Sequence, residues 1–278
     1  MEYKEGDIVK HPTKEDWGRE KVLADSDGDT VHVFFEWVGE KKLKLKYVQP
    51  IVVEGPGPFI TPPPPRPPKR KYQSILQSIQ LFLQQFPQGF YGKKFQEEER
   101  EYKDEARLLA QKLLEKGEYS LLLKDQDYEE IVKRALKIVN ATNLIFPNEK
   151  MSLRDGLENF DAKKEFSEVL YLLLYDEGEL EGRFNRFARM LEKINAAKWT
   201  TATYFPFIMF PENYMFVKPT VVKYASEACR REINYKSELN WHTYESVLKF
   251  SDYLFSEISE LKPRDMIDVQ TFMWCIAQ

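Results

Sequence analysis

The sequence predicts a multidomain α+β protein: a small N-terminal β-barrel over residues 1–54, a proline-rich linker over 55–71 and a mostly α-helical domain over 72–278. Three observations support this prediction. Apolar and polar residues alternate with a period of two in the first fifty residues, as they do in strands. Prolines crowd the next stretch. From Tyr72 onward, apolar residues recur every three or four positions, as they do in helices.

The N-terminal segment contains four candidate strands, at 6–10, 21–24, 31–36 and 41–47. In the third, Val31, Val33 and Phe35 would share the core face. Asp27-Gly28 predicts a tight hairpin, because glycine supplies a positive φ angle, and Gly39-Glu40 predicts a second turn.

The fourth candidate strand alternates most regularly. Leu43, Leu45 and Tyr47 would face the core, which leaves a row of lysines toward solvent: Lys42, Lys44 and Lys46. So few residues cannot bury a large core. They fit a compact barrel of the SH3 or Tudor type, a fold that binds partners rather than enclosing a substrate.

The linker combines prolines with positive charge. Proline fixes φ and removes a backbone donor, so the run Pro62–Pro65 predicts an extended polyproline II spacer. Its cations are Arg66, Lys69, Arg70 and Lys71, and residues 55–72 contain no acid. By contrast, residues 1–54 have 9 basic and 12 acidic side chains, and the rest of the chain has 28 and 33. The linker is therefore the one clearly electropositive stretch.

Beyond the linker we expect a series of amphipathic helices bounded by Gly, Pro or Asn. Gly117 is the expected stop of the second helix. One segment, 199–217, is aromatic, β-branched and interrupted by proline, and we expect it to be buried and irregular, with at most a short strand. The expected helices span 75–86, 96–116, 128–140, 161–176, 179–197, 219–231, 242–261 and 264–277.

The composition excludes several classes of protein. A net charge of −4 argues against a strongly basic nucleic-acid coat. There is no apolar run of about 18 residues and no signal peptide at the start of the chain, so we expect no membrane span and a cytoplasmic location. The two cysteines, Cys229 and Cys275, are too few for a disulfide framework. Glycine-rich phosphate loops and catalytic elbows are absent, so we expect no cofactor and no resident metal.

The residues Gly6–Pro12, Trp17-Gly18, Val33–Glu36 and Gly39–Lys42 resemble a small family of uncharacterised bacterial Tudor-like domains. The same outline is similar to the polymerase-interacting barrels of CarD-type regulators and transcription-repair coupling factors, and to the Tudor-like tail of UvrD-type helicases. This resemblance covers about a fifth of the chain, and it implies docking on polymerase or nucleic acid.

The C-terminal part resembles an uncharacterised bacterial helical family for which no activity is settled. The resemblance rests on Met215–Pro219, Asn234-Tyr235, Asn240-Trp241, Tyr244 and Arg264–Gln270.

Lys42, Lys44 and Lys46, together with Trp17 and Trp37, could form a groove that holds a nucleic-acid backbone and stacks bases. Alternatively, Trp17 belongs to the core and the lysines protect an edge strand.

Two further binding sites have equally simple alternatives. An aromatic cage for a cation would use Trp17, Phe34 and Trp37. Arg66, Lys69, Arg70 and Lys71 could meet phosphates, or a polyproline-binding domain could bind Pro62 to Pro68. Alternatively, these charges simply keep a solvated linker extended.

In the helical domain, one set of polar residues lies among aromatics and could line a pocket or a partner surface. Alternatively, it forms a buried hydrogen-bond network that positions the last helices. The set comprises Lys218, Asn240, Trp241, Tyr244, Arg264, Asp268 and Gln270.

Two features suggest chemistry but have simpler explanations. Asp265 and Asp268 are one helical turn apart, which suggests a metal-dependent, nuclease-like site. Alternatively, Asp265 is well placed to cap a helix. Cys229 precedes Arg230 and Arg231, which could activate a thiol, but it shares an apolar helix face and is expected to be buried and inert.

The sequence therefore predicts a non-enzymatic adaptor. Its barrel would dock on a nucleic-acid-processing machine or on DNA, and its helical domain would recruit a second protein, in DNA repair or anti-phage defence. We expect a protein partner, with nucleic acid as a further option. The alternatives are a nuclease-like enzyme with a site near Asp265 and Asp268, and a structural subunit of a larger complex that uses 199–216 as its interface.

Overall fold

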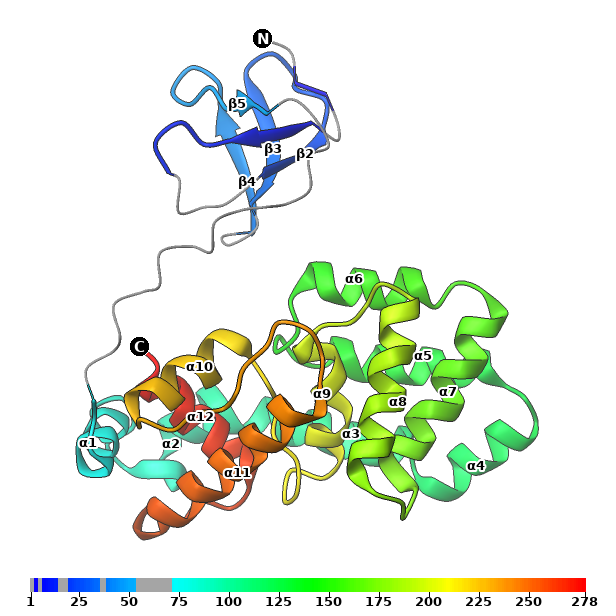
Figure 1. Ribbon diagram of the computed structural model, residues 1–278, viewed down its shortest axis with the longest axis vertical. Coiled ribbons are helices and arrows are strands. Elements are labelled where there is room, and N and C mark those ends of the chain that lie inside the picture. Colours follow the sequence, from blue (N-terminus) through cyan, green and yellow to red (C-terminus); the bar gives the residue numbers. More distant parts are fainter. Residues whose placement is uncertain (1–2, 5–6, 15–19, 36–38, 54–71) are drawn as a thin grey trace. The chain divides into compact units, whose positions relative to one another are not determined.

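The computed structural model of the chain describes residues 3–4, 7–14, 20–35, 39–53 and 72–278 (Figure 1). The chain divides into two compact units, Met1–Lys69 and Arg70–Gln278. The first contains a small β-sheet and the second is mostly helical, as the sequence predicts.

The N-terminal unit is built on a five-stranded sheet with the strand order β4-β3-β2-β1-β5. All neighbouring strands are antiparallel, so β4 and β5 form the two edges. The strands are β1 (Ile8–Lys10), β2 (Glu20–Ala24), β3 (Thr30–Phe35), β4 (Gly39–Lys44) and β5 (Ile51–Val52).

A small core lies against this sheet. It includes Val31 and Val33, which confirms the period-two reading of β3. The hairpin before β3 is also confirmed: Gly28 has φ +90°, and the Asp27 carboxylate accepts hydrogen bonds from the backbone N–H groups of Asp29 (3.0 Å) and Thr30 (2.6 Å). The buried residues of this core are Tyr3, Val9, Val22, Val31, Val33 and Leu43.

Two details of β4 differ from the prediction. The strand begins at Gly39, so the turn expected at Gly39-Glu40 is wrong. It ends at Lys44, and a turn follows at 45–47. Because the turn breaks the alternation, Leu43 is buried as expected but Tyr47 is 75% exposed rather than in the core.

The helical unit runs from α1 to α12. Near its start, α2, a π-helical turn at Gln96–Arg100 and α3 follow one another directly. The helices are α1 (Ile75–Gln85), α2 (Lys93–Phe95), α3 (Glu101–Leu113), α4 (Lys116–Lys124), α5 (Tyr128–Asn140), α6 (Pro147–Gly156), α7 (Phe160–Tyr175), α8 (Leu180–Lys193), α9 (Trp199–Met209), α10 (Pro219–Ala228), α11 (Trp241–Glu257) and α12 (Met266–Ile276).

Side-chain caps set many of these starts. Ser74 and Gln77 form a reciprocal capping box at α1. Asp127, Asn159 and Asn240 accept a backbone hydrogen bond at the starts of α5, α7 and α11.

The prediction for 199–217 is wrong in its secondary structure. Residues 199–209 form α9, and every one of its residues is buried. The helix contacts α3, α6, α7 and α8. A helix that is covered on all sides is apolar all round and leaves no amphipathic period in the sequence. Since α9 belongs to the core, it does not supply the exposed interface that the structural-subunit alternative required.

Other helices in the structure also differ from the sequence prediction. Both α4 and α6 were missed, and Gly117, expected to end a helix, lies in the first turn of α4. Helix α8 ends at Lys193 rather than at 197. Helix α6 has few apolar positions, Met151 and Leu153 among them, so its period is hard to recognise in the sequence.

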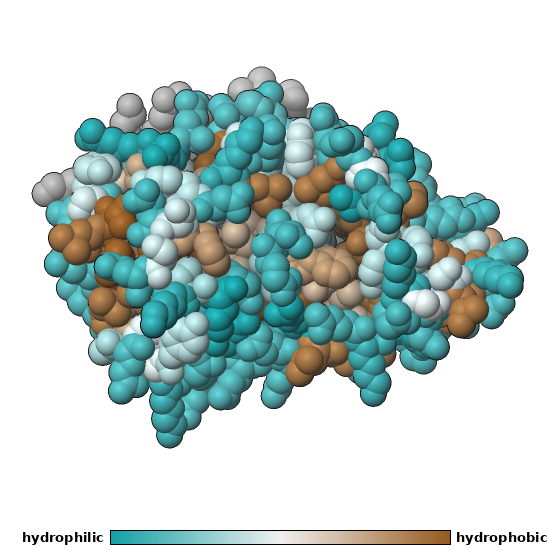
Figure 2. Space-filling model, turned by 90° about the horizontal axis from the view of Figure 1, so that it is seen from below, coloured by the Kyte–Doolittle hydropathy of each residue, from teal (hydrophilic) through white to brown (hydrophobic). Residues whose placement is uncertain are grey.

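Hydrophilic side chains cover most of the face shown in Figure 2, and hydrophobic side chains form separate patches on it. The exposed apolar residues include Leu76, Leu108, Leu121 and Phe160. Among the described residues, no helix combines the length and the apolar character needed to span a bilayer.

Candidate functional site: a buried ion-pair network between α3 and α12

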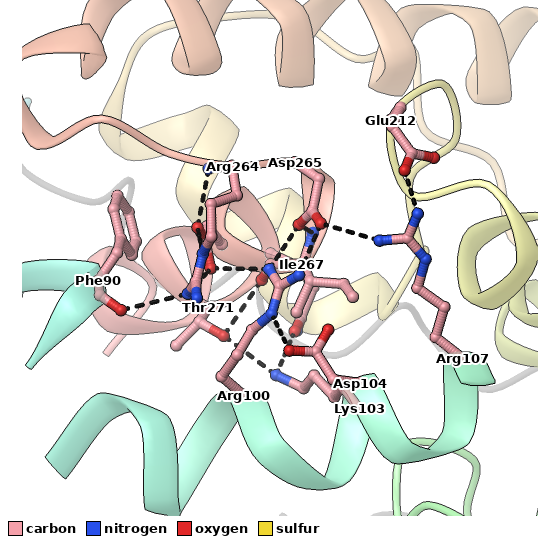
Figure 3. A network of polar contacts seen from close by, with 12 residues as sticks. Phe90, Arg100, Lys103, Asp104, Arg107, Glu212, Arg264, Asp265, Ile267 and Thr271 are labelled. Carbon is pink, nitrogen blue, oxygen red and sulfur yellow. Dashed lines mark hydrogen bonds and ion pairs between the residues drawn. The ribbon is translucent and has the colours of Figure 1, made fainter. Parts of the chain in front are cut away.

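The most concentrated set of charges in the helical unit lies between two distant parts of the chain. One part is the π-helical turn with α3, and the other is the start of α12 together with the loop before it (Figure 3). Their side chains point toward one another from opposite elements. We call this set the buried network; its members are Glu99, Arg100, Lys103, Asp104, Arg107, Glu212, Arg264, Asp265, Asp268, Gln270 and Thr271.

Arg100 is at the centre of the network. Its Nη1 and Nη2 donate to the two carboxylate oxygens of Asp265, at 2.7 Å each. Nη1 also donates to Asp268 Oδ1 at 3.1 Å, and Nε donates to Asp104 Oδ2 at 2.8 Å. This bidentate geometry is the strongest form of charged hydrogen bond in proteins. Arg100, Asp265 and Asp268 are all buried, so solvent screens these pairs little.

Asp268 is held by a second guanidinium as well. Arg264 Nε and Nη2 donate to its two oxygens at 2.8 Å each, and the Arg264 backbone N–H donates at 2.9 Å. Nη2 of Arg264 also donates to the carbonyl of Phe90 at 3.2 Å. The guanidinium lies over the ring of Tyr91, 5.1 Å from its centroid. Arg264 therefore ties the start of α12 to the segment before α2.

Lys103 is a second buried cation. Its Nζ donates to Glu99 Oε2 at 2.9 Å, to Thr271 Oγ1 at 3.0 Å and to Gln270 Oε1 at 3.2 Å. All three ammonium donors therefore have partners. Burial lowers the pKa of Lys103, and the negative charge of Glu99 opposes that shift.

Arg107 marks the edge of the network. It pairs with Glu212, and its Nη1 lies 3.7 Å from Asp265 Oδ2, while its buried Nε has no hydrogen-bond partner among the described residues. At the centre of the network, burial alone would lower the pKa of Arg100. Its hydrogen bonds to Asp265 and Asp104, and the charges of Asp265 and Asp268, outweigh burial and raise that pKa. Arg100 is thus a permanent cation fixed between carboxylates.

This arrangement limits the chemistry available here. Asp265 caps α12 by accepting the backbone N–H of Ile267 at 3.0 Å, as the simpler reading of the sequence expects, and it also holds Arg100. A metal ion or a proton in transit would have to displace guanidinium groups from both Asp265 and Asp268. Within the described ranges, no three histidine, cysteine or acidic side chains are grouped so that they could hold a metal ion. What the network does directly is lock α3 to α12.

The structure divides the predicted helical-domain set. Arg264, Asp268 and Gln270 belong to the buried network. The others lie elsewhere: Lys218 Nζ is 5.0 Å from the centroid of the Phe146 ring, and Asn240 caps α11.

Trp241 and Tyr244 follow Asn240 on the first turn of α11. Their ring centroids are 6.0 Å apart, and each ring also packs on Phe184. The Tyr244 hydroxyl donates to the carbonyl of Met215 at 3.4 Å. The rings of Trp241, Tyr244 and Phe184 form a packing cluster.

Sequence reasoning missed Arg100 and Lys103. Each forms an ion pair four residues along its own helix, Arg100 with Asp104 and Lys103 with Glu99. In the sequence, such spacing is typical of a solvated helix face. The weak available signal was the unusual wealth of alternating charge in 96–107.

In the N-terminal unit, Lys42, Lys44 and Lys46 are exposed, and Lys46 Nζ lies 5.9 Å from the centroid of the Tyr47 ring. The remaining predicted binding residues of the barrel and linker lie outside the described residues: Trp17, Trp37, Arg66, Lys69, Arg70 and Lys71. The groove and the aromatic cage that use the two tryptophans stay predictions.

Cys229 is buried, as expected from the apolar face that it shares. Burial raises the pKa of its thiol to about 11, and the nearby charge of Arg231 offsets only part of that increase. It is therefore a packed side chain rather than an activated nucleophile.

Comparison with known proteins gives one match. Residues 3–53 match the model of a family described as "Protein of unknown function (DUF3553)". The match coincides with the N-terminal unit and confirms its likeness to a family of uncharacterised small domains. No curated protein and no solved structure matches the chain. The likeness to polymerase-binding barrels, and that of the C-terminal part to a helical family, stay predictions.

Proposed function

We propose that the chain is a non-enzymatic docking adaptor. Its N-terminal unit binds nucleic acid or a protein of a nucleic-acid-processing machine, and its helical unit presents a fixed scaffold to a second protein. DNA repair and anti-phage defence are settings in which such an adaptor would act. The observation that carries the proposal is the row of exposed lysines along β4.

The row follows from the geometry of the strand. Lys42 and Lys44 alternate with the buried Leu43, so they project from the same face of β4. The exposed Lys46 lies in the turn that follows the strand. Because β4 is an edge strand among the described strands, none of them pairs with one side of its backbone. A line of ammonium groups beside a free strand edge suits either a phosphate backbone or an acidic peptide that adds a strand.

The same lysines have a simpler use, because charges on an edge strand prevent edge-to-edge aggregation. A test must therefore separate loss of partner binding from loss of solubility. Substitution by glutamine keeps the strand polar and removes only the charge.

The helical unit supports the scaffold part of the proposal. Its most concentrated charges are paired with one another in the buried network, as in a rigid support rather than a reaction centre. The linker, for which the sequence predicts an extended spacer, would give the two units reach.

The test is a pull-down from the source cell with the full chain and with a chain that lacks residues 1–54, each with and without nuclease treatment. A partner that is lost on truncation and resists nuclease would identify a protein-docking unit. A partner lost to nuclease would identify nucleic acid as the ligand. Equal capture by both chains would overturn the proposed role of the N-terminal unit.

A further inference from the structure

A groove in the helical unit combines cationic side chains with aromatic rings. It lies along the C-terminal part of α10, the loop 229–240 and the start of α11, and its volume is about 780 Å³. The cationic side chains on its walls are Lys223, Arg231 and Lys236, and His242 joins them from α11. None of these residues belongs to the buried network or to the lysine row of the N-terminal unit.

The cations of the groove are available to a ligand. Within the described part of the chain, no carboxylate lies within 4.0 Å of the charged atoms of Lys223, Arg231 or Lys236. Two acids, Glu227 and Glu232, also line the groove, and the charge of Glu238 interacts with that of Lys236. The three cations are therefore matched in number by acids nearby, although none of the three forms an ion pair among the described residues, whereas the helical unit as a whole is acidic.

Aromatic rings hold two of these cations in place. Lys223 Nζ lies 5.0 Å from the centroid of the Tyr235 ring, and the Arg231 guanidinium lies 3.9 Å from that of Tyr253. Arg231 as a whole is exposed. A guanidinium plane supported in this way is a stacking platform for a nucleobase.

The loop that forms one wall is fixed by hydrogen bonds. Thr243 Oγ1 donates to the Asn234 carbonyl at 2.7 Å and accepts the Lys236 backbone N–H at 3.2 Å. The Lys236 carbonyl in turn accepts Trp199 Nε1–H at 2.9 Å. Binding at a wall already ordered in this way avoids most of the entropic cost of ordering a loop.

The C-terminus of α10 also favours positive charge, through the helix dipole. That effect accounts for Arg231, which lies just beyond the helix, but not for Lys236 and His242, which come from the loop and from α11.

We propose that this groove binds the phosphate and base of a nucleotide unit, either free or within a single strand of nucleic acid. Lys223 and Lys236 contact the phosphate, and Arg231 stacks against the base. The proposal uses none of the lysines of β4, so it can fail while the proposed function stands, and the reverse also holds.

The test is hydrogen–deuterium exchange on the full chain, with binding affinity measured in parallel. The probes are adenosine diphosphate and a mixed-sequence single strand of about 12 nucleotides, long enough for one site. The variant Arg231→Gln/Lys236→Gln removes two exposed charges from the groove. Lys112→Gln/Lys124→Gln removes two exposed charges from α3 and α4 and serves as the matched control.

The wild type and the control should show slower exchange in 229–242 when the probe is present. The groove variant should lose this protection and bind about tenfold or more weakly, the effect of one lost charged hydrogen bond. Protection by the diphosphate alone identifies a free nucleotide as the ligand, and protection by the strand alone identifies nucleic acid. No protection by either probe, or equal losses in both variants, would overturn the proposal.

Discussion

Asp268 shows how single residues control this structure. Its side chain is fully buried and accepts hydrogen bonds from two guanidinium groups, that of Arg100 on one side and that of Arg264 on the other. A buried ion pair of this kind repays its desolvation cost only when every partner is present. Removal of one member leaves the others as uncompensated buried charges.

Asp268→Asn should therefore destabilise the helical unit strongly, by about 3–5 kcal/mol in the free energy of unfolding. The matched control is Asp104→Asn, which removes one hydrogen bond to Arg100 from a side chain that is 41% exposed, and should cost about 1 kcal/mol or less. Urea unfolding followed by far-UV circular dichroism measures both. Equal effects of the two substitutions would show that the buried network does not hold the unit together.

The spacing of Asp265 and Asp268 was visible in the sequence, but their partner was not. Arg100 lies 165 residues from Asp265, and no local pattern links positions so far apart. The capping role of Asp265 was predictable because it depends only on the residues that follow it. Local chemistry can be read from one sequence, whereas long-range pairing depends on the fold.

A second residue-scale prediction concerns Cys229. At pH 8 its thiol, with a pKa of about 11 in place of 9.0, should be about a hundredfold less ionised than in the unfolded chain. Alkylation by iodoacetamide should therefore be at least that much slower in the native protein than in urea, as mass spectrometry can measure. A native rate that matches the unfolded one would mean that Arg231 activates the thiol.

At the scale of elements, α9 shows where pattern reading fails. Its sequence is β-branched, aromatic and interrupted by Pro206, all of which disfavour a helix. Complete burial among four other helices outweighs these local preferences. By contrast, α5 and α7 were predicted almost to the residue, because each has one apolar face and a capping side chain.

Thr203 joins α9 to the segment that follows it. Its hydroxyl donates to the Trp199 carbonyl at 2.7 Å and accepts the Val217 backbone N–H at 2.9 Å. Thr203→Val keeps the shape but leaves that buried N–H without a partner, so it should cost about 1–3 kcal/mol in unfolding free energy.

The control for Thr203→Val is Ser251→Ala. The buried hydroxyl of Ser251 donates only to the Val247 carbonyl, four residues earlier in its own helix, so its removal should leave no buried group unsatisfied. Chemical denaturation of both variants measures the change in unfolding free energy that each substitution causes. A Thr203→Val protein as stable as the control would show that the Val217 N–H finds another partner.

At the scale of the whole molecule, the chain has two cores of very different size. Among the residues that the structure describes, six form the N-terminal core, whereas the helical core runs from α1 to α12. Small cores give marginal stability because little apolar surface is buried on folding. The two units should therefore unfold independently, with the N-terminal one first.

Differential scanning calorimetry of the full chain should show two transitions. Deletion of residues 1–54 should remove the lower one and leave the temperature of the upper one unchanged. A single cooperative transition, or a shift of the upper one after the deletion, would show that the two units stabilise each other.

The central claim is that the lysine row of β4 is a docking surface, and one measurement tests it most directly. The variant Lys42→Gln/Lys44→Gln/Lys46→Gln is compared with Lys4→Gln/Lys10→Gln/Lys14→Gln, which removes three exposed charges from other parts of the same unit. Partner capture from the source cell is measured for both variants and for the wild type over a range of salt concentrations. The account predicts that the first variant no longer captures the partner. The second variant should capture it with the same dependence on salt concentration as the wild type. Retention of the partner by the first variant, or equal losses by both, would contradict the account.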